Sequence, residues 1–106
     1  MRITEVTVEE LKEEIELLYF EHGVSELRFV ENFSSRNIDI IVDRLQVETE
    51  QDVVMIYDDK DILRYNECVC GMFLLHRLKS IHKEVVDQKV KFNLQLYGGT
   101  VTISTV

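Results

Sequence analysis

The hydrophobic residues near the N-terminus recur at steps of three and four, which is the period of an α-helix. They form one apolar stripe that consists of Val8, Leu11, Ile15 and Leu18. Thr7 and Glu10 have the spacing of a capping box, in which each side chain binds the backbone amide of the other residue. Gly23 can adopt the left-handed conformation that ends many helices. The pattern therefore predicts a helix over about residues 8–22.

Alternation of hydrophobic and polar residues, the period of a β-strand, begins at Leu27 and Phe29 and predicts a strand there. Residues 37–47 fit either a strand or a helix face, and their many β-branched side chains favour a strand. The short apolar run 53–57 predicts an interior strand. Residues 62–65 are expected to pair back on it as a short strand.

The C-terminal pattern is typical of a β-hairpin. Apolar residues alternate with polar ones over 90–96 and again over 101–103. Between these runs, Gly98 and Gly99 can supply the positive φ angles of a tight hairpin turn. We therefore predict that the chain ends in two paired antiparallel strands.

A second helix is predicted over about residues 67–86, with Asn66 as its N-cap. Its core stripe would be formed by Leu74, Leu78, Ile81 and Val85. The first half, Cys68–Leu75, is apolar on nearly every side, so it would be central or covered by a partner. The whole chain, residues 1–106, is thus predicted to be one small α+β domain. In this fold a mostly antiparallel sheet of four to six strands packs against two helices.

The composition supports one packed core. The chain has 106 residues, of which 45% are hydrophobic, and this excludes the disordered class. Its two cysteines, Cys68 and Cys70, are too few and too close for a disulfide framework, which indicates a reducing compartment. The N-terminus lacks the pattern of a signal peptide, and no apolar run approaches the ~20 residues that span a membrane. We expect a soluble, cytoplasmic protein without a membrane partner.

The charge is distributed unevenly along the chain. The formal net charge is −8, with 17 acidic and 6 basic residues in 1–61 but 3 acidic and 6 basic residues in 62–106. An acidic first half disfavours direct binding of nucleic acid, whose phosphates require positive charge. It suits a basic protein partner, or it serves solubility alone.

The acidic residues are densest on the first predicted helix. Glu9, Glu13 and Glu16 form a stripe on it, and Glu10 and Glu14 lie beside this stripe. Like charges at this spacing repel, and docking on a basic surface would relieve the repulsion. The alternative is an ordinary solvated helix face.

Three further acidic residues, Asp58, Asp59 and Asp61, follow the predicted strand 53–57 and would extend the acidic surface. Carboxylates in this position can hold magnesium, but no glycine-rich phosphate loop accompanies them. Aspartates also favour turns for local reasons, and turn chemistry explains them better.

No catalytic or metal motif passes a geometric check. Cys68, Cys70, His76 and His82 are residue types that bind zinc, but on one helix they would point in different directions. Ser34 and Ser35 lie in a predicted loop without the sequence context of a nucleophile. We therefore predict no metal, no cofactor and no catalytic residue.

These observations favour a non-enzymatic, acidic protein-interaction domain. It would act as an inhibitor, immunity or regulatory protein that docks on a basic protein surface. One alternative is a homo-oligomeric structural or assembly subunit, which would dimerise through the C-terminal strand or the apolar part of the second helix. The other alternative is a small metal-dependent enzyme with dispersed active-site residues.

Overall fold

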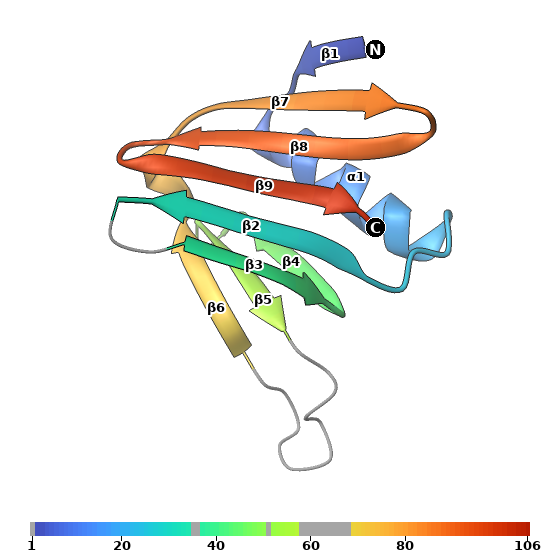
Figure 1. The fold of residues 1–106 in the computed structure, drawn as a ribbon, viewed down its shortest axis with the longest axis horizontal. Coiled ribbons are helices and arrows are strands. Elements are labelled where there is room, and N and C mark those ends of the chain that lie inside the picture. The colour runs from blue at the N-terminus through green and yellow to red at the C-terminus, as the bar shows by residue number, and fades with distance from the viewer. Residues whose placement is uncertain (1, 35–36, 51, 58–68) are drawn as a thin grey trace.

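The computed structural model describes residues 2–34, 37–50, 52–57 and 69–106. These segments form nine strands and one α-helix (Figure 1). In chain order the elements are β1 (Arg2–Glu5), α1 (Val8–Phe20), β2 (Leu27–Phe33), β3 (Asn37–Val42), β4 (Arg44–Glu48), β5 (Val53–Tyr57), β6 (Val69–Leu74), a one-turn 3-10 helix (Leu75–Arg77), β7 (Leu78–Val86), β8 (Lys89–Leu96) and β9 (Gly99–Thr105).

The strands form two antiparallel sheets. The large sheet has six strands in the order β1-β7-β8-β9-β2-β3, and the small sheet has three in the order β4-β5-β6. In Figure 1, α1 and the small sheet both lie behind the large sheet, so they cover the same face of it. The opposite face of the large sheet carries no second layer from the described residues.

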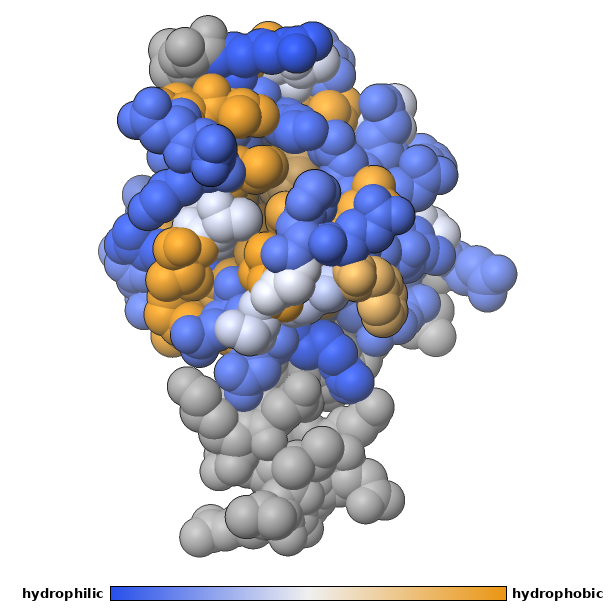
Figure 2. All heavy atoms as spheres, turned by 90° about the vertical axis from the view of Figure 1, so that its right-hand side faces the viewer, coloured by the Kyte–Doolittle hydropathy of each residue, from blue (hydrophilic) through white to orange (hydrophobic). Residues whose placement is uncertain are grey.

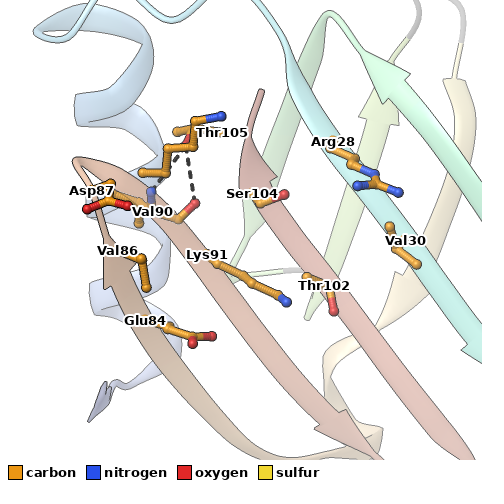
Figure 3. Close-up of a pocket in the computed structure, with 11 residues that line it drawn as sticks. Arg28, Val30, Glu84, Val86, Asp87, Val90, Lys91, Thr102, Ser104 and Thr105 are labelled. Carbon is orange, nitrogen blue, oxygen red and sulfur yellow. Dashed lines mark hydrogen bonds between the residues drawn. The ribbon is translucent and has the colours of Figure 1, made fainter. Parts of the chain in front are cut away.

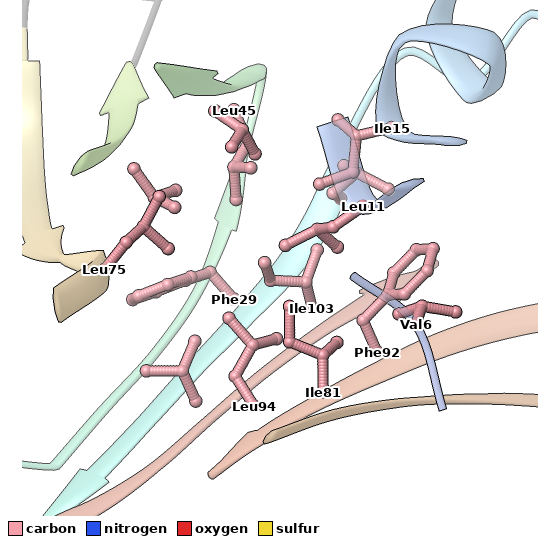
Figure 4. Packing of buried hydrophobic residues seen from close by; sticks show 14 of the residues in the cluster. Val6, Leu11, Ile15, Phe29, Leu45, Leu75, Ile81, Phe92, Leu94 and Ile103 are labelled. Carbon is pink, nitrogen blue, oxygen red and sulfur yellow. The ribbon is translucent and has the colours of Figure 1, made fainter. Parts of the chain in front are cut away.

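The core lies between the large sheet and this second layer (Figure 4). Leu11 and Ile15 of α1 are buried in one cluster with Phe29 of β2 and Phe92 of β8. Leu45 of β4 belongs to the same cluster, so the helix and the small sheet share one core. Burial of these side chains is the main force that holds the second layer on the sheet.

The predicted first helix is confirmed together with its cap. The Thr7 hydroxyl accepts a hydrogen bond from the Glu10 amide at 3.1 Å, and the Glu10 carboxylate accepts one from the Thr7 amide at 3.0 Å. The helix ends at Phe20, two residues earlier than predicted. Gly23 adopts a φ of +65°, the left-handed conformation expected of it after a helix.

The predicted strands at residues 27 and 53–57 are confirmed as β2 and β5. Residues 37–47 form strands, as their β-branched side chains favour, but a bend at Asp43 divides them into two strands. The break places β3 in the large sheet and β4 in the small one. The expected short strand at residues 62–65 lies outside the described residues.

The C-terminal hairpin is confirmed, with a different turn from the one expected. Leu96 pairs with Gly99, so Tyr97 and Gly98 form the turn, and Gly98 has a φ of +91°. Gly99 is instead needed for space, because a Cβ atom there would collide with the Phe33 ring and the Asn32 carbonyl.

The second predicted helix is wrong. The described part of this segment, from residue 69 onward, forms β6, the 3-10 turn and β7. Strand β7 pairs with the distant β1 on one side and forms a hairpin with β8 on the other, and these sheet pairings override the local helical spacing. Of the expected core stripe, Ile81 is buried, whereas Leu78 and Val85 are half-buried. The described residues thus have one helix instead of two, and more strands than the four to six predicted.

Candidate functional site

Helix α1 presents one face to the core and the opposite face outward. Leu11, Ile15 and Leu18 are buried on the inner face. At 100° per residue, Glu9, Glu13, Glu16 and Phe20 fall within about 60° of one another on the outer face. We call these four residues the outer stripe.

The carboxylates of the outer stripe are available for binding. Glu9, Glu13 and Glu16 are exposed, and within the described residues none of them forms an ion pair or a side-chain hydrogen bond. Phe20 is 85% exposed, the highest value among the exposed large hydrophobic residues of the described chain. An uncovered aromatic residue therefore ends a line of carboxylates that form no ion pair within the described residues.

The other two glutamates predicted for partner binding have roles within the fold. Glu10 closes the capping box. Glu14 is half-buried and forms an ion pair with Lys83 of β7, with 2.6 Å between Oε1 and Nζ. This pair ties the middle of α1 to the large sheet. The sequence offered no signal for it, because 69 residues separate the two partners.

A second contact ties α1 to the small sheet. The Tyr19 hydroxyl accepts a hydrogen bond from the Leu45 amide at 3.0 Å. This amide points away from β5, so α1 covers the free edge of β4 at this point. A hollow of about 390 Å³ lies beside the contact, and its lining includes Glu16 and Phe20 of the outer stripe.

The remaining surface near the end of α1 is mixed in character. Figure 2 shows the side of the molecule at the right of Figure 1, with hydrophilic residues in blue and hydrophobic ones in orange. Hydrophobic residues gather there in separate patches between hydrophilic ones. The hydrophobic residues on this side of the described molecule therefore do not form one continuous apolar surface.

The uncovered face of the large sheet carries a second, more polar hollow of about 680 Å³ (Figure 3). Its lining comes from β2, β7, β8, β9 and the turn after β7, and it includes Arg28, Glu84, Lys91, Thr102 and Ser104. The lining combines three basic residues with two acidic ones, so it is neither a purely basic nor a purely acidic patch.

Arg28 in this hollow already has a partner on the neighbouring strand. Its guanidinium contacts the carboxylate of Asp39 on β3 at 2.5 Å. The hydrogen bond between them lowers the pKa of Asp39 and raises the pKa of Arg28. Both groups are therefore charged at neutral pH, and each neutralises the other.

The residues considered for metal binding are only partly described. Asp58, Asp59 and Asp61 lie outside the described residues, as does Cys68. The exclusion of a zinc site assumed that its four ligands lie on one helix. His76 instead lies in the 3-10 turn and His82 on β7, so that assumption is wrong. Across the described chain, no three His, Cys, Asp or Glu side chains gather closely enough to hold a metal ion.

Neither surface predicted for homodimerisation exists in the expected form. The C-terminal strand β9 pairs with β8 on one side and β2 on the other, so it has no free edge. The apolar segment 69–74 is strand β6 instead of part of a helix. The edges of the large sheet are β1 and β3, and no other described strand pairs with their outer sides.

Comparison with family models, curated proteins and solved structures found no match to this chain. In the part of the chain that the structure describes, no helix has the length and apolar character needed to cross a membrane. The functional conclusion therefore depends on the geometry and chemistry of the outer stripe.

Proposed function

We propose that this protein is a non-enzymatic, acidic interaction domain that docks on a basic surface of another protein through the outer stripe of α1. It would act as an inhibitor, an immunity protein or a regulatory protein. The observation that carries the proposal is the line formed by Glu9, Glu13 and Glu16, which are exposed and have no ionic partner among the described residues.

The arrangement of these carboxylates costs the free protein a little stability. Glu9 and Glu13 are four residues apart, and Glu13 and Glu16 are three apart, so both pairs repel. Each such pair destabilises a helix by about 0.2–0.5 kcal/mol. A basic partner would turn this repulsion into attraction, and the negative surface would also speed the encounter.

Phe20 adds a second kind of contact. Aromatic residues are enriched among the anchors that supply most of the binding energy in protein interfaces. Phe20 has carboxylates on both sides along the chain, since Glu16 and Glu21 are also exposed. The partner that fits this surface has an apolar pocket for one aromatic ring and basic residues around it.

The helix is held firmly enough to present these groups in a fixed arrangement. The Glu14–Lys83 ion pair anchors it to the large sheet, and the Tyr19–Leu45 hydrogen bond anchors it to the small sheet. A surface that is already ordered loses less conformational entropy when it binds. This favours a docking role for the helix over a segment that folds on contact.

The proposal predicts that partner capture is sensitive to salt. The immobilised protein should retain a partner with a basic surface from a lysate of its native host at low salt, and rising salt should release it. An unrelated protein of similar isoelectric point serves as the control for simple ion exchange. Capture that is unchanged by salt, or a retained partner without a basic surface, would contradict the proposal.

A further inference from the structure

The two edges of the large sheet differ in how they are protected from pairing with other strands. Edge strand β1 has only four residues, all exposed, and it carries the charged side chains of Arg2 and Glu5. Short length and charge are common means of preventing an edge from pairing. Strand β3 at the other edge has six residues, contains no lysine, arginine or proline, and pairs with β2 without a bulge.

Two of the four exposed residues on β3 are large and apolar, and the other two are Asn37 and Asp39. Ile40 is 37% exposed and Ile41 is 41% exposed, and as neighbours in a strand they lie on opposite faces of the sheet. Ile40 lies on the inner face, because it pairs with the buried Phe29. The second layer therefore leaves the inner face partly uncovered at this edge.

Strand β4, the edge of the small sheet next to α1, provides a contrast. Its outward-facing Leu45 amide is occupied by the Tyr19 hydroxyl. Thus β1 is short and charged and β4 is covered, whereas β3 combines an outer edge that no described strand pairs with and two exposed isoleucines. Of these three edges, β3 is the one suited to adding a strand.

We propose that β3 pairs with β3 of a second copy of this chain, in antiparallel orientation, so that the two large sheets form one continuous sheet. A two-fold axis normal to the sheet generates this pairing and keeps the inner faces of both copies on the same side. Directly opposite residues of an antiparallel pair have side chains on the same face. Only registers in which inner-face residues meet inner-face residues are therefore allowed.

Two allowed registers are centred on the middle of the strand. A register centred on Asp39 would place its carboxylate opposite the same carboxylate of the second copy, and like charges in this position are destabilising. A register centred on Ile40 places two isoleucines opposite each other. It also places Ile38 opposite Val42, and Asp39 opposite Ile41.

The register centred on Ile40 is therefore the one that the charges and side chains favour. Asp39 keeps its ion pair with Arg28 within its own sheet, so no unpaired charge enters the contact. This dimer uses no residue of the outer stripe. It is consequently independent of the proposed docking function, and either proposal can fail without the other.

The test is sedimentation equilibrium of the whole chain over a series of concentrations. The wild type should form a reversible dimer, and Ile40→Lys and Ile40→Glu should each weaken it by about tenfold or more, because like charges then meet at the axis. An equimolar mixture of the two variants should recover the dimer, since opposite charges then meet. Circular dichroism of each variant confirms that it is folded.

Two further variants test the location and the register. Ile3→Lys makes a similar change on the opposite edge, β1, and should leave the dimer intact. Ile41→Glu, which faces Asp39 of the second copy, should weaken the dimer more than Ile41→Lys does. A monomeric wild type, a dimer that tolerates both Ile40 variants, or failure of their mixture to associate would overturn the proposal.

Discussion

Replacing Phe92 with alanine should lower the free energy of unfolding by about 3–5 kcal/mol, a large part of the roughly 5–15 kcal/mol typical of a domain. Phe92 is 1% exposed and lies in the core cluster (Figure 4). It also lines a small hollow with Leu17 and Leu18 of α1. The alanine variant would therefore leave a cavity between the central strands and the helix.

Chemical denaturation followed by circular dichroism measures this loss. Tyr97→Ala is the control, because Tyr97 is an aromatic residue on the same hairpin that is 63% exposed, and it should change the stability by far less. Equal losses for the two variants would mean that the helix and the sheet do not share the core described here. Partner binding should also weaken in Phe92→Ala, since α1 loses part of its support.

Reversing the charge of the outer stripe should reduce affinity for the captured partner by roughly a hundredfold at low salt. The variant is Glu9→Lys, Glu13→Lys and Glu16→Lys in one chain. All three side chains are exposed and none has a partner among the described residues, so their replacement breaks no contact of the described fold. The loss arises because each lysine would face a basic group of the partner.

Isothermal titration calorimetry with the purified partner provides the measurement. A matched control carries Glu5→Lys, Glu26→Lys and Glu50→Lys, which gives the same net charge without altering the outer stripe. If binding depends only on net charge, the two variants lose affinity equally, and the stripe has no specific role. A selective loss in the first variant supports a defined docking surface.

The sequence predicted those elements whose signals are local. The first helix has an apolar stripe, and its capping box lies within four residues, so neither depends on distant parts of the chain. The C-terminal hairpin was predictable for the same reason, because its two strands are adjacent in sequence and Gly98 supplies the positive φ of its turn.

Strand β7 could not be predicted in this way, because its pairing with β1 and β8 decides its structure and its local spacing does not. Leu78, Ile81 and Val85 have helical spacing, but β1 and β8 recruit the segment into the sheet. The sequence of the turn that joins β7 to β8 does not indicate a hairpin. Asp87 and Gln88 occupy φ angles of +50° and +67° there, without the glycine that usually marks such a turn.

The candidate site was predicted in part. Exposure of Glu9, Glu13 and Glu16 followed from their place opposite the apolar stripe of the helix. The ion pair of Glu14 depends on Lys83, which the sheet brings near only after folding. Phe20 was missed, although its position eleven residues after Glu9 places it on the same side of the helix.

The most direct test of the docking surface is solution NMR of the isotope-labelled protein with the captured partner. The account predicts that the resonances of Glu9, Glu13, Glu16 and Phe20 change most on binding, while those of Thr102 and Ser104 on the uncovered sheet face remain unchanged. Changes confined to the sheet face, with the outer stripe unaffected, would contradict the central claim.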